Sequence, residues 1–113
     1  EEAFCGLRED REAPMAILVC GDNRDLKSPE FWPQDCAAAV ENILLAACSR
    51  GLGSVWMGVY PKEPIMDGLR RLLELPEFLV PFALVAIGYG AEEKGPSNRY
   101  DPGRVYRNVW KKE

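Results

Sequence analysis

Residues 51–61 read "GLGSVWMGVYP", a short apolar run set between glycines and a proline. The run is of strand type, because β-branched and aromatic residues are enriched in strands. Gly58 interrupts it, although glycine weakens the interior of a strand. Two explanations stay open from these residues alone. Either the strand has a β-bulge at Gly58, or a flat ligand approaches the backbone there so closely that a side chain would be in the way.

The other two glycines of this stretch do not form a dinucleotide-binding fingerprint. Gly51 and Gly53 follow a helical segment and precede a strand, whereas the fingerprint follows a strand and opens a helix. Gly51 is placed to end the helix, and Gly53 is placed in a turn. Trp56 and Met57 are interpreted first as core residues and second as the wall of a planar pocket.

The segment before this stretch predicts a helix that is apolar nearly all round. Pro33 suits the first helical turn and Gly51 the position just past the end. From residue 36 to residue 48 only Glu41 and Asn42 are polar. A helix on the surface of a monomer keeps a wide polar face. We therefore expect a second cover from another subunit; the alternative is a central helix inside a larger monomer.

The remaining periodicity predicts a layered α/β or α+β domain with helices packed on a sheet. Residues 14–20 are continuously apolar, which indicates a strand buried on both faces in the middle of a sheet. The turn chemistry of residues 21–30 follows it. The later elements are a strand over 54–60, a helix over 64–75 and a strand over 82–89, followed by an extended tail.

Length and charge limit the classes of function. The 113 residues allow one domain, and the chain has no apolar run long enough to span a membrane. The net charge of −4 argues against nucleic acid as the main partner. Residues 91–113 carry +2 and the remainder −6, so the tail is suited to a phosphate group or is simply solvated. The chain opens with Glu1 rather than Met and has no signal peptide, which indicates an interior cut or a processed end.

Cysteine and histidine usage directs the chemistry toward a bound cofactor. The four cysteines match no zinc pattern, and Cys20, Cys36 and Cys48 are expected to be buried structural thiols in a reducing, cytoplasmic compartment. Cys5 has no interpretation. The chain has no histidine, the commonest general base and metal ligand. Without it a Ser-His-Asp or Cys-His site is excluded within this chain, and we expect no metal site.

Four stretches together resemble the C-terminal two-thirds of a nitroreductase-family flavoprotein. They are "APMAILVCGD", "FWPQDCAAAVENILLAACSRGLGSVWMGVYP", "LLELPEFLVPFALVAIGYGAEEK" and "NRYDPGRVYRNVW", which run in unbroken order from Ala13 to Trp110. The resemblance implies an α+β nitroreductase-like fold with a mixed sheet, flanking helices and an intertwined homodimer through helix 34–50. It also implies one FMN at each subunit interface.

The resemblance implies the activity and the site residues as well. Members of the family take a hydride from NAD(P)H and pass electrons to nitroaromatic or quinone-like acceptors by a ping-pong route. The segment Trp56, Met57, Gly58 and Val59 matches the strand that lies against the flavin, with the backbone N–H of Gly58 bonded to flavin N5. Such a donor stabilises a nitrogen that becomes electron-rich on reduction, and it needs no ionisable side chain. The basic residues that match the family's FMN-phosphate contacts are Arg99 and Lys94.

The chain departs from the family pattern at its N-terminus. The Arg/Ser-rich FMN-phosphate element expected there is not seen in "EEAFCGLREDRE", so residues 1–113 are expected to form a single domain that is incomplete at the N-terminus. Gly90 stands where close relatives have proline. A second hypothesis follows: a non-catalytic dimerisation or ligand-binding domain with a nitroreductase-like fold and an incomplete flavin site.

Overall fold

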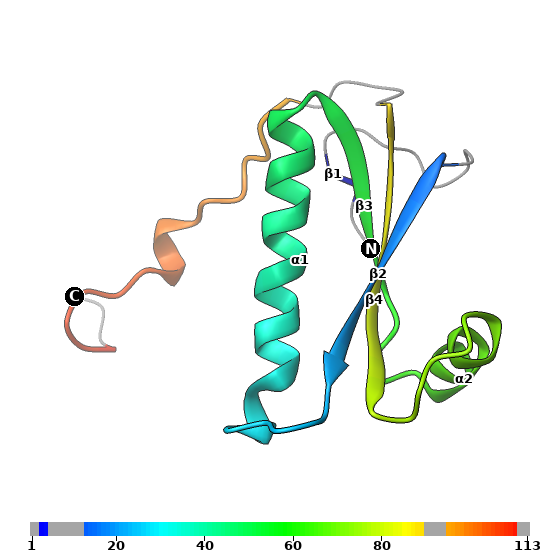
Figure 1. Ribbon diagram of the computed structural model, residues 1–113. Helices are drawn as coiled ribbons and strands as arrows, with labels where there is room; N and C mark the ends of the chain where they lie inside the picture. The colour runs from blue at the N-terminus through cyan, green and yellow to red at the C-terminus, as the bar shows by residue number, and fades with distance from the viewer. Residues whose placement is uncertain (1–2, 5–12, 90–94, 111–113) are drawn as a thin grey trace.

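The computed structural model describes residues 3–4, 13–89 and 95–110 (Figure 1). The predicted order of strand, helix, strand, helix, strand is confirmed, although most boundaries differ by a few residues. The elements are β1 (Ala3–Phe4), β2 (Met15–Asp22), the 3-10 helix η1 (Pro29–Phe31), α1 (Trp32–Ser49), β3 (Leu52–Gly58), α2 (Glu63–Leu72), β4 (Leu79–Tyr89) and the 3-10 helix η2 (Pro102–Arg104).

The strands form one antiparallel sheet in the order β1-β3-β4-β2, and α1 packs against one of its faces (Figure 1). The α+β class is confirmed, but every pairing among the described strands is antiparallel rather than mixed. The prediction of a central strand at residues 14–20 was wrong, because β2 lies at an edge of the described sheet. Its apolar residues contact α1 on one face, and half of the strand's residues are only half-buried.

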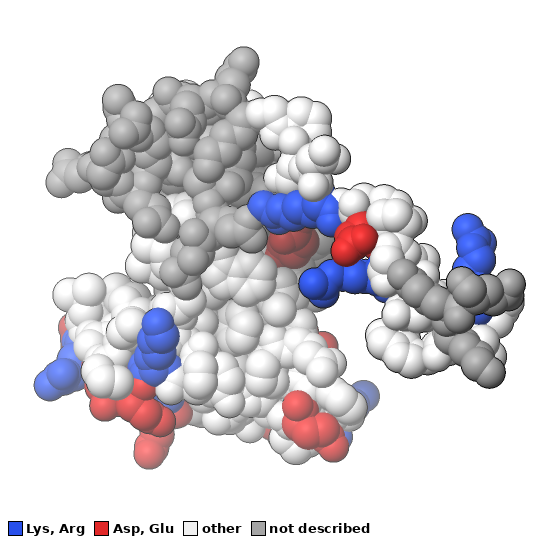
Figure 2. All heavy atoms as spheres, turned by 180° about the vertical axis from the view of Figure 1, so that it is seen from behind, with Lys and Arg blue, Asp and Glu red and all other residues white. Residues whose placement is uncertain are grey.

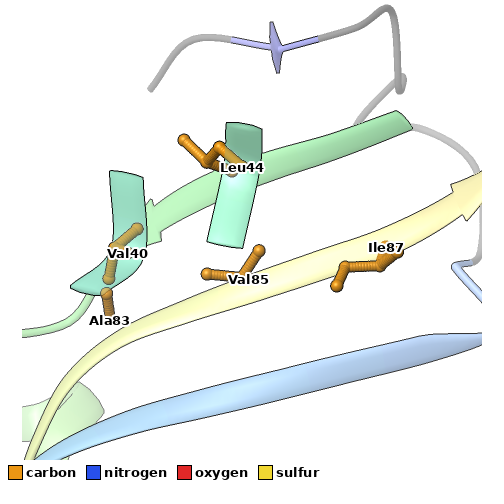
Figure 3. Packing of buried hydrophobic residues seen from close by; sticks show 5 residues of the cluster. All are labelled: Val40, Leu44, Ala83, Val85 and Ile87. Atoms are coloured by element: carbon orange, nitrogen blue, oxygen red, sulfur yellow. The ribbon is translucent and has the colours of Figure 1, made fainter. Parts of the chain in front are cut away.

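The core lies between α1 and the α1-facing side of β4. Val40 and Leu44 of the helix meet Ala83, Val85 and Ile87 of the strand (Figure 3). All five side chains are buried. Spacings of four along the helix and two along the strand place each set on one face of its element. Residues 52–58 lie beside this core, so the core fixes the position of β3.

The loop between α1 and β3 confirms the interpretation of Gly51. This residue has φ of 75°, the left-handed conformation that glycine adopts without steric cost, and it follows directly after the helix. β3 then begins at Leu52, two residues earlier than expected, and ends at Gly58. Its register with β4 runs unbroken to the pair Gly58–Ala83, so the bulge expected as one option is not at Gly58.

Helix α1 buries one side only against the described part of the chain. Its buried residues are Cys36, Val40, Leu44 and Ala47, which repeat every three or four residues. Small and apolar residues of the opposite side are exposed, including Ala38 and Leu45. The second cover that the sequence predicts is therefore not supplied by the described part of the chain.

The C-terminal segment (residues 95–110) extends away from the sheet on the side of α1 (Figure 1). Of its residues only Gly103 and Tyr106 are half-buried, and the others are exposed. Tyr106 and Trp110 stack on each other with ring centroids 4.1 Å apart. No helix in the described ranges has the length and apolarity needed to cross a bilayer.

The cysteines differ from expectation at Cys48, and Cys20 is only half-buried. Cys20 and Cys36 are free thiols, as expected, and Cys36 is buried. Cys48 takes part in a disulfide bond, so the expectation of a free thiol there was wrong. The expectation of burial came from the apolar residues next to Cys48 in the sequence. In the fold Cys48 lies on the exposed side of α1.

Candidate functional site

The edge of β3 beyond β1 presents backbone groups that no described strand covers. β1 pairs only with Ser54 and Val55. In an antiparallel pair, consecutive residues direct their N–H and C=O groups alternately toward and away from the partner strand. Val59 N–H donates to the carbonyl oxygen of Phe82 in β4, at 3.2 Å. Adjacent residues alternate in direction, so Gly58, one residue before Val59, directs its N–H away from β4, toward the open edge.

The residues next to Gly58 occupy both faces of the sheet. Trp56 packs against the core under α1, whereas Met57 packs on the opposite face beside the buried pair Val55 and Ala86. Both side chains are half-buried, as is Gly58 itself. The structure therefore supports the core interpretation of Trp56 and Met57, and no described strand pairs with Gly58 on the side away from β4.

The chain turns out of the sheet directly after Gly58. The N–H groups of Val59 and Tyr60 both donate to the carbonyl oxygen of Phe82, at 3.2 and 2.9 Å. Val59 is buried, and Tyr60 is 39% exposed. The Tyr60 ring stacks on Phe82 at 6.2 Å between centroids and meets Trp32 edge to face at 4.8 Å. An aromatic cluster thus borders the end of β3.

The predicted phosphate residues lie apart from this edge or outside the described residues. Arg99 is an exposed residue of the C-terminal segment. Lys94 lies outside the described residues. Figure 2 shows basic side chains spaced along the C-terminal segment, whereas the middle of that face of the molecule is largely uncharged. Within one chain the structure does not bring Arg99 and Gly58 into a single described pocket.

Among the described residues, the ionisable groups near the sheet do not form a nucleophilic site. Burial raises the pKa of the Cys20 and Cys36 thiols, so both groups stay protonated more readily. The reactive nucleophile is the thiolate and not the thiol. Asp22 binds Arg24 through a pair of oxygen contacts, and the Arg24 guanidinium also lies 3.9 Å from the centre of the Phe78 ring. These groups join two loops and are suited to structure rather than to proton transfer.

Sequence reasoning missed the aromatic cluster of Trp32, Tyr60 and Phe82. It also treated Gly21 as turn chemistry, whereas Gly21 is a buried residue of β2 that lies under the Trp32 ring. The local signal was an aromatic residue next to a proline at each of Trp32, Tyr60 and Phe82. The contacts join segments far apart in the chain, so no spacing rule reveals them.

Comparison with known proteins decides the family. The model of the nitroreductase family matches residues 3–89, which is most of the chain. This protein belongs to the nitroreductase family. A curated relative from Methanothermobacter thermautotrophicus, provisionally named NADH dehydrogenase/NAD(P)H nitroreductase, is 49% identical over 100 residues. The nitroreductase-like fold expected from the four stretches is confirmed.

Two solved structures are similar to this chain as well. A protein of Clostridium acetobutylicum, provisionally named NADH oxidase, superposes with a TM-score of 0.83 at 36% identity, over 87% of this chain. A nitroreductase with bound FMN from Bacteroides fragilis superposes with a TM-score of 0.60 at 28% identity, over 83% of this chain.

The nitroreductase-family chain described here is short beside these proteins. It spans 52% of the length of the Methanothermobacter relative. It covers 60% and 50% of the Clostridium and Bacteroides structures, respectively.

Proposed function

We propose that this chain is the flavin-bearing part of an FMN-dependent NAD(P)H oxidoreductase of nitroreductase type. The observation that carries the proposal is the Gly58 N–H, directed at an open strand edge in a chain of this family. The Bacteroides nitroreductase with bound FMN supports FMN as the ligand. When bound, FMN supplies the hydride-transfer chemistry between NAD(P)H and a nitroaromatic or quinone-like acceptor by a ping-pong route.

The residues at the edge of β3 fit a flat ring system. Gly58 has no side chain to keep such a ring from the peptide plane, and its fixed N–H meets a nitrogen that gains electron density on reduction. Trp56, Met57 and Val59 hold this peptide in place from the two faces of the sheet, because each packs into the surrounding apolar side chains. No proton-transfer residue is required of the chain.

The proposal includes a homodimer through α1, with Arg99 and Lys94 as phosphate contacts. An exposed apolar side of α1 and an extended C-terminal segment both suit a second copy of the chain. Arginine binds phosphate in a bidentate manner, which suits Arg99 for that part of FMN. Residues 1–113 are proposed as one domain that is incomplete at its N-terminus, in keeping with the share of its relatives that the chain spans.

A cytoplasmic location is part of the proposal. The free thiols of Cys20 and Cys36 support a reducing compartment. The Cys48 disulfide is an observation against it.

Flavin binding by the purified chain tests the proposal. We expect a yellow protein whose FMN absorbance band bleaches on addition of NAD(P)H. Gly58→Val should abolish FMN binding, because a side chain at this position would keep a flat ring from the peptide plane. Gly68→Ala is the matched control: a Cβ there meets no atom within 4 Å, so FMN binding should persist. A wild-type chain that takes up no FMN from excess contradicts the proposal.

A second candidate function is a non-catalytic dimerisation or ligand-binding domain of nitroreductase-like fold. The observation that favours it is the short chain, which spans about half of its curated relative. Under this alternative Gly58→Val changes only stability. A colourless dimer whose association is unaffected by Gly58→Val would support the alternative over the enzyme.

A further inference from the structure

Trp32, the first residue of α1, occupies a position between three strands. Its ring lies against the backbone of β2: a Cβ added to Gly21 would come near the ring, at 2.8 Å from Cζ3. The same ring meets Tyr60 after β3 at 4.8 Å between centroids and Phe82 of β4 at 6.1 Å. Trp32 therefore contacts β2 on one side of its ring and Tyr60, directly after β3, on another.

Phe82 is the extra residue of a β-bulge. The register of β2 with β4 passes from Val19–Ala83 to Cys20–Pro81, so Phe82 has no partner residue in β2. A bulge bends its strand and redirects a side chain. The Phe82 ring joins the aromatic cluster under α1, and its carbonyl oxygen accepts from both Val59 and Tyr60. Two donors on one acceptor turn the chain out of the sheet immediately after Gly58.

The direction of the Gly58 N–H is set from both ends of the peptide that carries it. Toward the N-terminus, the regular pairing of Met57 with Leu84 fixes the strand. Toward the C-terminus, the turn at Val59 and Tyr60 fixes the exit. Trp32 contacts the two rings, Tyr60 and Phe82, that border this turn. If the Trp32 ring is lost or displaced, the Tyr60 and Phe82 rings can move. The Gly58 peptide can then change its orientation.

We infer that Trp32 is a positioning residue for the flavin-facing N–H of Gly58. The ring contacts no cofactor atom in this account and acts through Tyr60 and Phe82. The inference rests on the proposed function for its consequence, because a misdirected N–H weakens the preference for reduced over oxidised FMN. Its structural part, the coupling of Trp32 to the Gly58 amide, stands without any cofactor.

Two variants perturb Trp32 in independent ways. Trp32→Ala removes the ring, and Gly21→Ala pushes it from below, because the new Cβ clashes with rigid ring atoms. The double variant sharpens the test: once the ring is gone, Gly21→Ala has nothing to displace and should have no further effect. Trp32→Phe keeps an aromatic ring and should restore most of the function. Val40→Ala, a core change on the same helix, is the control for lost stability alone.

Two measurements follow each variant. In the chain without FMN, the backbone amide resonance of Gly58 should move and hydrogen exchange at Tyr60 N–H should accelerate in Trp32→Ala and Gly21→Ala, but not in Val40→Ala. With FMN, the ratio of dissociation constants for oxidised and reduced FMN should fall about tenfold, which corresponds to about 30 mV in the two-electron midpoint potential.

The outcomes separate this inference from the proposed function. A chain that binds no FMN overturns the proposed function, and the amide measurements still decide the role of Trp32. Unchanged amide signals and an unchanged affinity ratio in a folded Gly21→Ala chain, together with Trp32→Ala where it folds, overturn the inference alone. An equal response in Val40→Ala also overturns it, because the effect would then be general loss of stability.

Discussion

Ser54 carries a hydroxyl group that the fold leaves without a partner. The residue is fully buried in β3, and its Oγ has no hydrogen-bond partner in the described part of the chain. A buried unsatisfied polar group costs roughly 1–3 kcal/mol. We therefore expect Ser54→Ala to raise the free energy of unfolding by about 1 kcal/mol, measured by urea denaturation. Ser49→Ala, at an exposed hydroxyl that bonds Ala46, is the control. A loss of stability in Ser54→Ala would mean that the hydroxyl has a partner.

Asp22 gives the stability a dependence on acid pH. Hydrogen bonds from the Arg24 side chain and backbone lower its pKa from 3.8 to about 2. Because the folded pKa lies below the unfolded value, the stabilisation is present above pH 3.8 and is lost as the pH falls through 2. In urea unfolding between pH 5 and 2, Asp22→Asn should show a shallower pH dependence than the wild type. Arg107→Gln, far along the chain, should leave the slope unchanged. Equal slopes for the wild type and Asp22→Asn would contradict the pairing.

Gly58 shows what local sequence could and could not predict at the residue scale. Composition and the break in a strand pattern singled it out, because glycine in a strand is unusual. The direction of its N–H depends on the parity of the pairing with β4, which no local pattern contains. The role of Trp32 was out of reach for the same reason, since its contacts join β2, β4 and the turn after β3.

At the scale of elements, α1 is the feature that the single chain leaves incomplete. Leu45 is 51% exposed in the middle of its outer side, next to small residues. Leu45→Glu should convert a dimer to a monomer in sedimentation experiments, because a buried charge without a partner is costly. Leu72→Glu on α2, at a residue 75% exposed, is the matched control and should leave the association state unchanged. A Leu45→Glu chain that sediments like the wild type would exclude this side of α1 as the interface.

The elements themselves were largely predictable, and the errors have physical causes. Proline at the start and glycine past the end located α1 to within about a residue or two. The continuous apolar run of β2 suggested a central strand, yet the strand lies at the edge of the described sheet. Apolar residues on both faces of a strand indicate that both faces are packed against something. They do not indicate which element packs there, or whether the strand has neighbours on both of its edges. The long reach of β4, from Leu79 instead of residue 82, reflects pairing across a bulge that the sequence does not mark.

At the scale of the whole molecule, the chain is more extended than a compact domain. Its radius of gyration is 17.1 Å. A compact domain of this length has about 13 Å. The C-terminal segment accounts for part of the difference, and it exposes large apolar side chains such as Trp110, at 82%. An extended segment of this kind gains little from packing on its own chain, so we expect its order to depend on a partner surface.

Coupling between FMN and dimer formation is the prediction that belongs to this scale. If a second copy completes the FMN site, each ligand bound stabilises the dimer, and by linkage dimer formation tightens FMN binding. At FMN concentrations about a hundred times the dissociation constant, the dimer should persist at protein concentrations lower by about a hundredfold per site. Sedimentation across protein concentrations, with and without FMN, measures the shift, and Leu45→Glu should remove it. FMN affinity that is independent of protein concentration would instead show that one chain holds the complete site.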